Sequence, residues 1–500
     1  ALVGSLDYLI DFPYGCTEQT MSRFYPTLLA ERLGAVPANR VEDLPRLVRD
    51  GVARLARLQH GTGGWGWWQN DSDDAFMTAY VLVGLSAAKA QGYPVDEGLI
   101  RRGVEAAEKL SKSAPAAVRP FVLYALAEAG YDDSKTNLLR APFRYSAVRT
   151  GLDLDKLPPD ALAYLVLLAR RLGEDHRPAY NALQRRAAVE GRLTSWKVDA
   201  GHWAHGSDRM ATALGLRALM AVEPEDRRIP SVLRWLMQSR TDSWFGNTRD
   251  TAWVLVAFCD YLRHRPGESA DPNGTLEVRV NNQVVRSIDL AADSQGEPEI
   301  TLSLPADRLK AGPNQVEVVR TSGSGTVFYS GALRQTVAAP AGGELAALTL
   351  PNGIKVEREV VRVLPRKVGD DGLWRLATEP VPNGVFRQGD RLRVRVKLTV
   401  PRDASYVLIE DAFPSGAEVT ERGTADQDVE SWSFWYDHVE VRDDRIAFFA
   451  RRLPAGTHVL EYNLRAQTPG TSHALPTHVE GMYDASVRAE SATGRLEVKP

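Results

Sequence analysis

The hydrophobic pattern of this 500-residue chain changes its period near residue 265, and this change limits the fold more than any other feature of the sequence. Before that point, three segments run from a Gly/Trp-rich loop through a polar cap into a Thr-Ala pair and an apolar helix: Trp65–Ala79, Trp203–Ala213 and Trp244–Ala252. Helix starts of this kind recur about every 40 to 50 residues, a period that fits helical hairpins closed into a ring. We therefore predict an α/α toroid over residues 1–265.

After residue 265, apolar and polar residues alternate, which is the period of a half-buried β-strand. The alternation is clearest over residues 276–280, 392–400 and 460–466. A Pro/Gly/Ala segment at 339–343 indicates a linker. A chain of this length is expected to hold about three domains. The predicted fold class is multidomain α + β, an α/α toroid followed by antiparallel β-sandwich domains, with boundaries at 1–265, 266–340 and 345–500.

Composition excludes several kinds of partner and site. The net charge of -3 gives no basic field that would attract nucleic acid or an anionic membrane. No apolar run reaches the roughly 18 residues that a membrane-spanning helix needs. We expect no cofactor and no metal site. Since the chain starts at Ala1 without an initiator Met or a signal peptide, we expect a fragment or a processed piece of a longer protein.

The low cysteine content bears on the cellular compartment of the protein. Cys259 lies in an apolar helical segment and is interpreted as a buried helix residue, which leaves Cys16 without a disulfide partner. A secreted animal protein of this size would normally be rich in disulfides. We therefore expect a bacterial periplasmic or cell-envelope protein, monomeric, and attached to the inner membrane only through a lipidated segment outside this sequence.

Cys16 and Gln19 lie three residues apart at the expected start of a helix, in the run Pro-Tyr-Gly-Cys-Thr-Glu-Gln at 13–19. One helical turn brings positions i and i+3 onto the same face, so the Cys16 sulfur can meet the Gln19 side-chain carbonyl. A thiol held there can displace ammonia and leave an internal thioester. The alternative is that Cys16 is a small buried hydrophobe and Glu18-Gln19 a solvated first turn.

The run Phe-Pro-Tyr-Gly-Cys-Thr-Glu-Gln-Thr-Met-Ser at 12–22 resembles the thioester signature of the alpha-2-macroglobulin family, especially that of its bacterial members. The resemblance extends over essentially the whole chain. It implies a thioester domain, then the C-terminal part of a CUB-like domain, then a C-terminal macroglobulin-like domain. It also implies a broad-spectrum, stoichiometric endopeptidase inhibitor rather than an enzyme, in which a Cys16–Gln19 thioester captures attacking proteases covalently after they cleave a bait segment upstream of residue 1.

Water hydrolyses an exposed thioester, so the resting protein must keep the bond dry. Phe12 and Tyr14 flank the thiol in the sequence and are candidates for this cover. The resemblance implies a second contribution from the last domain, where Met482-Tyr483 resembles the contact pair of bacterial members. For the three tryptophans of a nearby loop we favour simple core packing: Trp65, Trp67 and Trp68.

The attacking nucleophile is expected to be a lysine amine of the protease. Complement-type members of the family carry a histidine beside the thioester that redirects the reaction towards hydroxyls, and the corresponding segment here, 111–118, contains none. His202 and His205 are the residues that would upset this expectation. We interpret them as loop histidines, although their i, i+3 spacing is also compatible with weak metal binding.

Three other functions are compatible with parts of the sequence. Class II terpenoid cyclases share the toroid and use an Asp-x-Asp-Asp acid, which Asp71-Ser72-Asp73-Asp74 imitates, although helix capping is the better account of these carboxylates. A non-covalent adhesive module with an unformed thioester is the second alternative. A cysteine protease is the weakest, because no motif identifies the histidine base that it needs.

Overall fold

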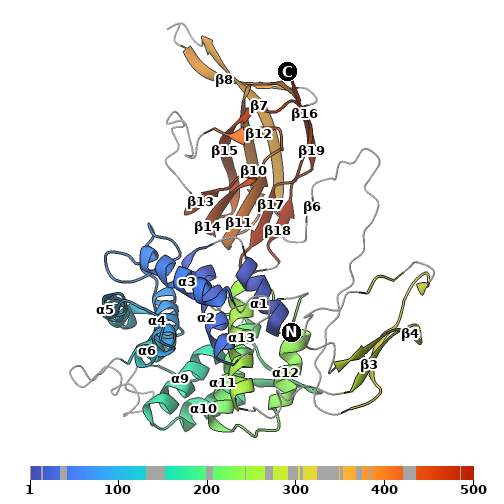
Figure 1. The fold of residues 1–500 in the computed structure, drawn as a ribbon. Helices are drawn as coiled ribbons and strands as arrows, with labels where there is room; N and C mark the ends of the chain where they lie inside the picture. The colour runs from blue at the N-terminus through green and yellow to red at the C-terminus, as the bar shows by residue number, and fades with distance from the viewer. Residues whose placement is uncertain are drawn as a thin grey trace. The chain divides into compact units, whose positions relative to one another are not determined.

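In the computed structural model, the chain folds into two compact units, Ala1–Leu333 and Arg334–Pro500 (Figure 1). Each unit is described by itself below. The described residues are 2–12, 15–33, 42–130, 152–198, 206–241, 244–264, 274–290, 302–304, 308–323, 348–349, 353–367, 374–381, 384–420, 435–484 and 486–500. The predicted linker at 339–343 and the predicted domain end at residue 265 lie outside them, so the three domain boundaries stay predictions.

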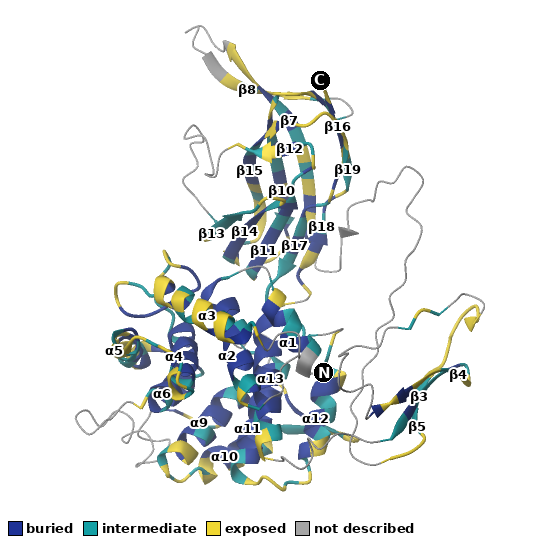
Figure 2. Cartoon of the chain, viewed as in Figure 1, coloured by how far each residue is buried: buried dark blue, intermediate teal, exposed yellow. Residues whose placement is uncertain are grey.

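Six helices form the inner ring of the first unit, each contacting the next, and the sixth closes onto the first (Figure 1). They are α2 (Thr17–Arg32), α4 (Ala75–Ala90), α6 (Arg119–Glu128), α9 (Pro159–Leu172), α11 (Asp208–Val222) and α13 (Thr248–His264). These helices are buried on nearly all sides: in α4 every residue from Phe76 to Leu85 is buried (Figure 2). Such all-round burial is expected of a helix with neighbours on every face.

An outer layer of helices covers this ring. Helix α1 packs on α2 and α13, α3 on α2, α5 on α4 and α6, α10 on α9, and α12 on α11. Their bounds are α1 (Leu2–Asp11), α3 (Leu44–Leu58), α5 (Glu97–Ser113), α10 (Arg177–Arg185) and α12 (Ile229–Gln238). The outer helices are amphipathic; α3, for example, buries Leu44, Val48, Leu55 and Leu58 on one face. The predicted α/α toroid is confirmed.

Trp253 of α13 fills the axis of the toroid. Each of the other five inner helices places one side chain against its indole ring, which is fully buried. The distances from the Trp253 ring centre are 6.4 Å to Tyr25, 5.3 Å to Tyr80, 5.7 Å to Phe121, 5.9 Å to Tyr164 and 6.0 Å to the Arg217 guanidinium carbon. Aromatic pairs at these distances stabilise the packing beyond their buried area. The centre of the ring is therefore side-chain core.

A repeated threonine contact explains the Thr-Ala pairs of the sequence. The Thr78 hydroxyl of α4 accepts from the Trp65 amide (3.0 Å) and donates to the Trp65 carbonyl (3.2 Å). Thr212 of α11 makes the same two bonds, at 3.0 and 3.2 Å, with Trp196 at the end of the hairpin β1 (Ala187–Glu190) and β2 (Leu193–Trp196). Trp203, the start of the predicted segment Trp203–Ala213, lies outside the described residues.

A three-stranded sheet of order β4-β3-β5 follows the toroid in the sequence. Its strands are β3 (Thr275–Val280), β4 (Gln283–Asp289) and β5 (Val316–Arg320). Asn281 and Asn282 have φ angles of 51° and 69°, and both lie in the left-handed region that a two-residue hairpin turn requires. Leu276 and Val280 are buried, as their alternation with polar residues predicts.

The second unit is a sandwich of a five-stranded and a six-stranded sheet, with orders β12-β15-β10-β7-β8 and β13-β14-β11-β17-β18-β6, and a three-stranded sheet β16-β19-β9 beside them. Its strands are β6 (Leu348–Thr349), β7 (Lys355–Lys367), β8 (Trp374–Pro380), β9 (Val385–Arg387), β10 (Arg391–Val400), β11 (Ala404–Ala412), β12 (Ala417–Val419), β13 (His438–Val441), β14 (Arg445–Leu453), β15 (Gly456–Ala466), β16 (Gly470–Ala474), β17 (His478–Gly481), β18 (Arg488–Glu490) and β19 (Gly494–Lys499). Among the described strands, β19 and β9 are the one parallel pair.

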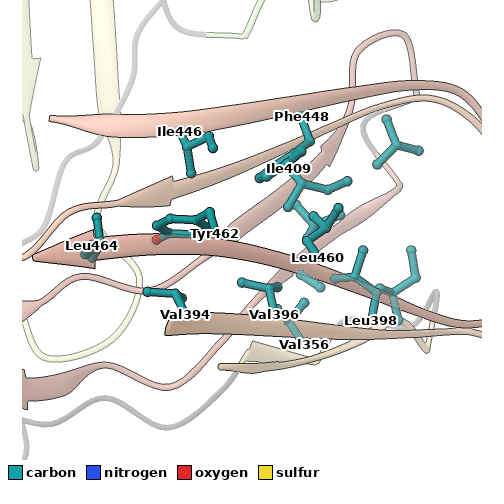
Figure 3. Close-up of a cluster of buried hydrophobic side chains, with 14 of the residues drawn as sticks. Val356, Val394, Val396, Leu398, Ile409, Ile446, Phe448, Leu460, Tyr462 and Leu464 are labelled. Carbon is teal, nitrogen blue, oxygen red and sulfur yellow. The ribbon is translucent and has the colours of Figure 1, made fainter. Parts of the chain in front are cut away.

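The core of the sandwich comes from the alternating residues that the sequence analysis identified. Val394, Val396 and Leu398 of β10 face Ile409 and Phe448 from the other sheet (Figure 3), and all five side chains are buried. The same cluster holds Leu460, Tyr462 and Leu464 of β15. The predicted antiparallel β-sandwich is confirmed.

One carboxylate lies in this core and links the two sheets. Asp411 of β11 has no exposed surface and accepts hydrogen bonds from Arg358 Nε of β7 (2.9 Å), Tyr462 OH of β15 (2.5 Å) and Thr477 Oγ1 (2.9 Å). Burial, and then the charge of Asp411, raises the pKa of Tyr462, so its hydroxyl stays protonated and donates. Thr477 immediately precedes β17, so the link reaches the strand that leads to Met482.

Candidate thioester site

Cys16 and Gln19 form a reciprocal cap at the start of α2. Cys16 is the N-cap residue, with extended backbone (φ -64°, ψ 172°), and Gln19 is the third helical residue. The Gln19 amide lies 3.5 Å from Cys16 Sγ, and the Cys16 amide donates to Gln19 Oε1 at 3.1 Å. This is a capping box in which a thiol takes the usual place of a hydroxyl. The backbone donor polarises the Gln19 carbonyl on the same turn that holds the sulfur.

The whole first turn of α2 is buried. The alternative interpretation, in which Glu18 and Gln19 form a solvated turn, is therefore wrong. Exposed fractions are 0% for Cys16, Thr17 and Glu18 and 4% for Gln19. A carboxamide and a carboxylate are costly to bury unless they are hydrogen-bonded, so the turn is built for specific partners. The thioester bond itself stays a prediction.

Glu18, between the two capping residues, anchors the turn to two other helices. Its carboxylate accepts from Ser22 Oγ (2.5 Å) and from Thr248 Oγ1, which lies 2.9 and 3.2 Å from the two carboxylate oxygens. Ser22 Oγ in turn lies 3.4 Å from Tyr80 OH. Burial raises the pKa of Tyr80, so the phenol stays neutral. Thr248 is the first residue of α13, so the carboxylate joins the two helices that close the ring.

The tryptophan loop between α3 and α4 reaches the same turn through its backbone. The Thr17 amide, which has no partner inside its own helix, donates to the Trp67 carbonyl at 2.9 Å. Trp67 is held in turn by its own amide, which donates to Asp71 Oδ2 at 2.9 Å. Trp67 and Trp68 are 2% and 5% exposed, while Trp65 is fully buried with its indole N–H on the Leu55 carbonyl. The loop therefore lies against the first turn of α2, and Trp65 belongs to the core.

Arg54 of α3 contacts the chain just before the capping box, at Gly15. Its Nε donates to the Gly15 carbonyl at 2.7 Å, and a Cβ at position 15 would lie 2.7 Å from guanidinium atoms. Any side chain at 15 would displace Arg54. Neither Arg54 nor Thr248 was identified from the sequence. Thr248 has a signal there, because it lies in the polar run 247–251 in front of an apolar segment.

The four predicted shielding residues have different positions. Phe12 follows α1, is partly buried, and packs edge-on against Tyr8 at 5.9 Å between ring centres. Tyr14 lies outside the described residues. Met482 and Tyr483 belong to the second unit, where the Met482 amide donates to the Tyr406 carbonyl (2.7 Å) and the Tyr483 ring packs 5.2 Å from that of Tyr406. Their contact with the thioester region stays a prediction.

The structure describes only some of the residues on which the expected absence of an acyl-transfer histidine depends. Residues 111–118 form the end of α5 and the short connection to α6, and His202 and His205 lie outside the described residues. One histidine missed by the sequence analysis, His60, lies in the tryptophan loop. Its Nδ1 is 2.7 Å from Asp73 Oδ1 and its Nε2 is 2.8 Å from the Trp68 carbonyl, so both ring nitrogens are engaged in holding the loop. Within the described residues, no cluster of His, Cys, Asp or Glu has the arrangement of a metal site.

The acidic segment 71–74 is used structurally. Asp74 is the N-cap of α4 and accepts from the Met77 amide at 2.9 Å, while Asp73 binds His60 and Thr62. Asp71 and Asp73 line an open surface pocket of about 610 Å³. A cyclase would need them to face an enclosed apolar cavity that holds its substrate, and the toroid axis is filled around Trp253. Helix capping, which we favoured, accounts for Asp74 alone, whereas Asp71 and Asp73 hold the loop before the helix.

Two parts of the chain match known families. Residues 353–485 match the "Bacterial Alpha-2-macroglobulin MG10 domain", and residues 2–106, which include the capping box, match the "A-macroglobulin TED domain". The chain belongs to the bacterial alpha-2-macroglobulin family. Curated alpha-2-macroglobulins that it resembles include that of Thermotoga maritima, 44% identical over 259 residues (52% of this chain, 14% of the relative), and that of Escherichia coli, 24% identical over 522 residues (97% and 28%).

Solved alpha-2-macroglobulins have the same fold. A point mutant of the Salmonella protein gives a TM-score of 0.67 at 22% identity, covering 99% of this chain and 30% of that one. The native Escherichia coli protein from domain MG7 to the C-terminus gives 0.66 at 20% identity, covering 99% and 75%. The chain spans less than a third of the two curated alpha-2-macroglobulins. In its described residues, no helix combines the length and the apolar character that crossing a bilayer requires.

Proposed function

We propose that this chain is the C-terminal part of a broad-spectrum protease inhibitor that traps its targets covalently through a Cys16–Gln19 thioester. The observation that supports this most directly is the buried capping box, which holds a thiol and a carboxamide on one turn with the carbonyl already bonded to a backbone N–H. Membership of the bacterial alpha-2-macroglobulin family supports the same function. A trap of this kind is consumed as it reacts and is therefore not an enzyme.

The chemistry has two acyl transfers. First, Cys16 Sγ attacks Cδ of Gln19, the C–N bond breaks, and the amide nitrogen leaves as ammonia with the proton of the thiol. Later, a neutral lysine amine of the bound protease attacks the same carbon, the C–S bond breaks, and the amine proton goes to the leaving thiolate. The second step is downhill because a thiolate, of pKa about 8.5, is a far better leaving group than an amine.

The resting thioester would have to be kept dry until the protease arrives. The tryptophan loop and Arg54 supply cover within the first unit. We propose that Phe12 and Tyr14 add to it from the chain before Cys16, and that Met482 and Tyr483 add to it from the second unit. The working place that we propose is the periplasm or cell envelope of a bacterium, with the inhibitor acting as a monomer.

Intact mass tests the first step. The closed chain is lighter by one ammonia than the encoded sequence, and methylamine should add its own mass while freeing one thiol. Alkylation of native protein cannot replace this measurement, because both Cys16 and Cys259 are buried and both would resist the reagent. A native mass equal to that of the encoded chain, with Gln19 intact and two thiols titrating after denaturation, would leave the non-covalent binding module as the better function.

The second step is tested with the full-length inhibitor and a serine protease such as trypsin. The proposal expects a covalent adduct in which a protease lysine is joined to residue 19, and no adduct from the Cys16→Ala or Gln19→Ala variants. Adducts of equal yield in either variant would exclude the thioester as the trap.

A further inference from the structure

We propose that Glu18 and Thr248 form a buried clamp that holds the first turn of α2 in the geometry from which the thioester forms, which makes Glu18 a positioning residue of this site. The inference rests on the proposed function, since it concerns formation of the same Cys16–Gln19 bond. It assigns a role to the residue between the two capping residues and to a side chain about 230 positions away in the sequence.

The contacts that define the clamp are short and fully enclosed. Glu18 has no exposed surface, and Thr248 is 5% exposed. The Thr248 hydroxyl reaches both carboxylate oxygens, at 2.9 and 3.2 Å, and the Ser22 hydroxyl reaches one of them at 2.5 Å. A buried carboxylate without such donors would be strongly unfavourable, so the donors fix where this side chain can lie. The position of Glu18 is therefore coupled to the first residue of α13.

Two helix N-termini meet at this carboxylate, and both favour its negative charge. Glu18 lies in the first turn of α2, and Thr248 opens α13. The positive end of each helix macrodipole attracts an anion at this place. A glutamine side chain has the same shape but no charge, so it would lose this attraction and one of the two acceptor oxygens.

The clamp holds the turn on the side away from the reacting groups. Cys16 and Gln19 share one face, while Glu18 points to the face that it shares with Ser22, one turn further on. On the remaining side, the Trp67 carbonyl holds the Thr17 amide. Both contacts oppose unwinding of this first turn. Unwinding would separate the sulfur from the Gln19 carbonyl, which must approach to about 3 to 3.5 Å for attack.

The experiment compares two isosteric substitutions of buried threonines. Thr248→Val removes the hydroxyl from the clamp. Thr212→Val is the matched control, because Thr212 is fully buried and hydrogen-bonded in an equivalent helix but contacts Trp196 and not the site. Each variant is first treated with ammonia, which opens any thioester to the Cys16 thiol and the Gln19 carboxamide, and is then denatured. On refolding, the loss of one ammonia is followed by intact mass, with thermal melting measured in parallel.

We expect Thr248→Val to form the thioester about ten- to a hundredfold more slowly than wild type, the usual effect of a small misplacement of reacting groups. Thr212→Val should form it at the wild-type rate although its melting temperature falls by a similar amount. Thr248→Ser, which restores the hydroxyl, should recover most of the rate. If Thr248→Val does not refold, Ser22→Ala takes its place in the same comparison.

The outcomes separate this inference from the proposed function. Wild-type protein that never loses ammonia contradicts the function, and the clamp with it. If wild type forms the thioester and Thr248→Val forms it as fast as Thr212→Val, the clamp is refuted and the function stands. Equal slowing of both variants, in proportion to their loss of stability, refutes the clamp as well, because it reduces Thr248 to an ordinary structural contact.

Discussion

Removing the carboxylate of Asp411 should destabilise the second unit more than any other single polar substitution that its described residues offer. In Asp411→Ala, the Arg358 guanidinium, only 6% exposed, would lose its buried counter-ion, and the hydroxyls of Tyr462 and Thr477 would lose their acceptor. Breaking a buried ion pair on one side costs about 3 to 5 kcal/mol, because the other charge is left uncompensated. We expect a loss of that size in the free energy of unfolding of the second unit.

The assay is denaturant unfolding of the whole chain, followed by a signal that separates the two units. The transition of the toroid should stay at its wild-type midpoint, since the Asp411 carboxylate makes its hydrogen bonds within the sandwich. The double variant Arg358→Met/Asp411→Leu removes both charges, and buried pairs replaced in this way often regain most of the lost stability. It is the control for the uncompensated charge.

Two results would refute this reasoning. A loss below about 1 kcal/mol in Asp411→Ala would show that water or a neighbouring group satisfies Arg358, since a surface pair is worth that little. A double variant as unstable as the single one would show that the cost comes from packing and not from the unpaired charge.

The remaining predictions concern the thiols, the nucleophile and one histidine. Cys16→Ala should cost about 1 kcal/mol relative to methylamine-treated wild type, as expected for loss of an N-cap, with thermal melting as the measurement. Cys259, whose pKa burial raises to about 12, should resist alkylation at pH 8 in native protein, and rapid labelling would contradict its place in the core. Adducts should survive hydroxylamine because lysine amides do, whereas release would indicate hydroxyl attack. A hydrogen bond from His478 to Glu480 raises the pKa of His478 above its usual value. The stabilisation that protonated His478 contributes is therefore complete at low pH and is lost as pH rises through the folded-state pKa. His478→Gln should flatten this pH dependence, measured by unfolding at pH 6 to 9.

The fold was predictable from the sequence because its signals are local and repeated. The Thr-Ala pairs mark helix starts through one contact that recurs at Thr78 and Thr212, and strict alternation in 392–400 leaves one face for the core. Trp196 shows the limit of this approach. Its contact with Thr212 was not predicted, because spacing alone does not show which residue of the preceding chain the threonine binds.

The candidate site was predictable only in its local half. Cys16 and Gln19 are joined by helix geometry, and the four residues 16–19 contain all of that signal. Thr248 reaches the same turn because α13 closes the ring against α2, and Arg54 reaches it because α3 packs on the outside of α2. Residues 13–19 carry no signal for either of these long-range contacts. The two halves differ in what they supply. In the mechanism that we propose, the local half brings the thiol to the carbonyl, and the distant half excludes water and fixes the orientation. An isolated peptide with the same motif should therefore form no lasting thioester.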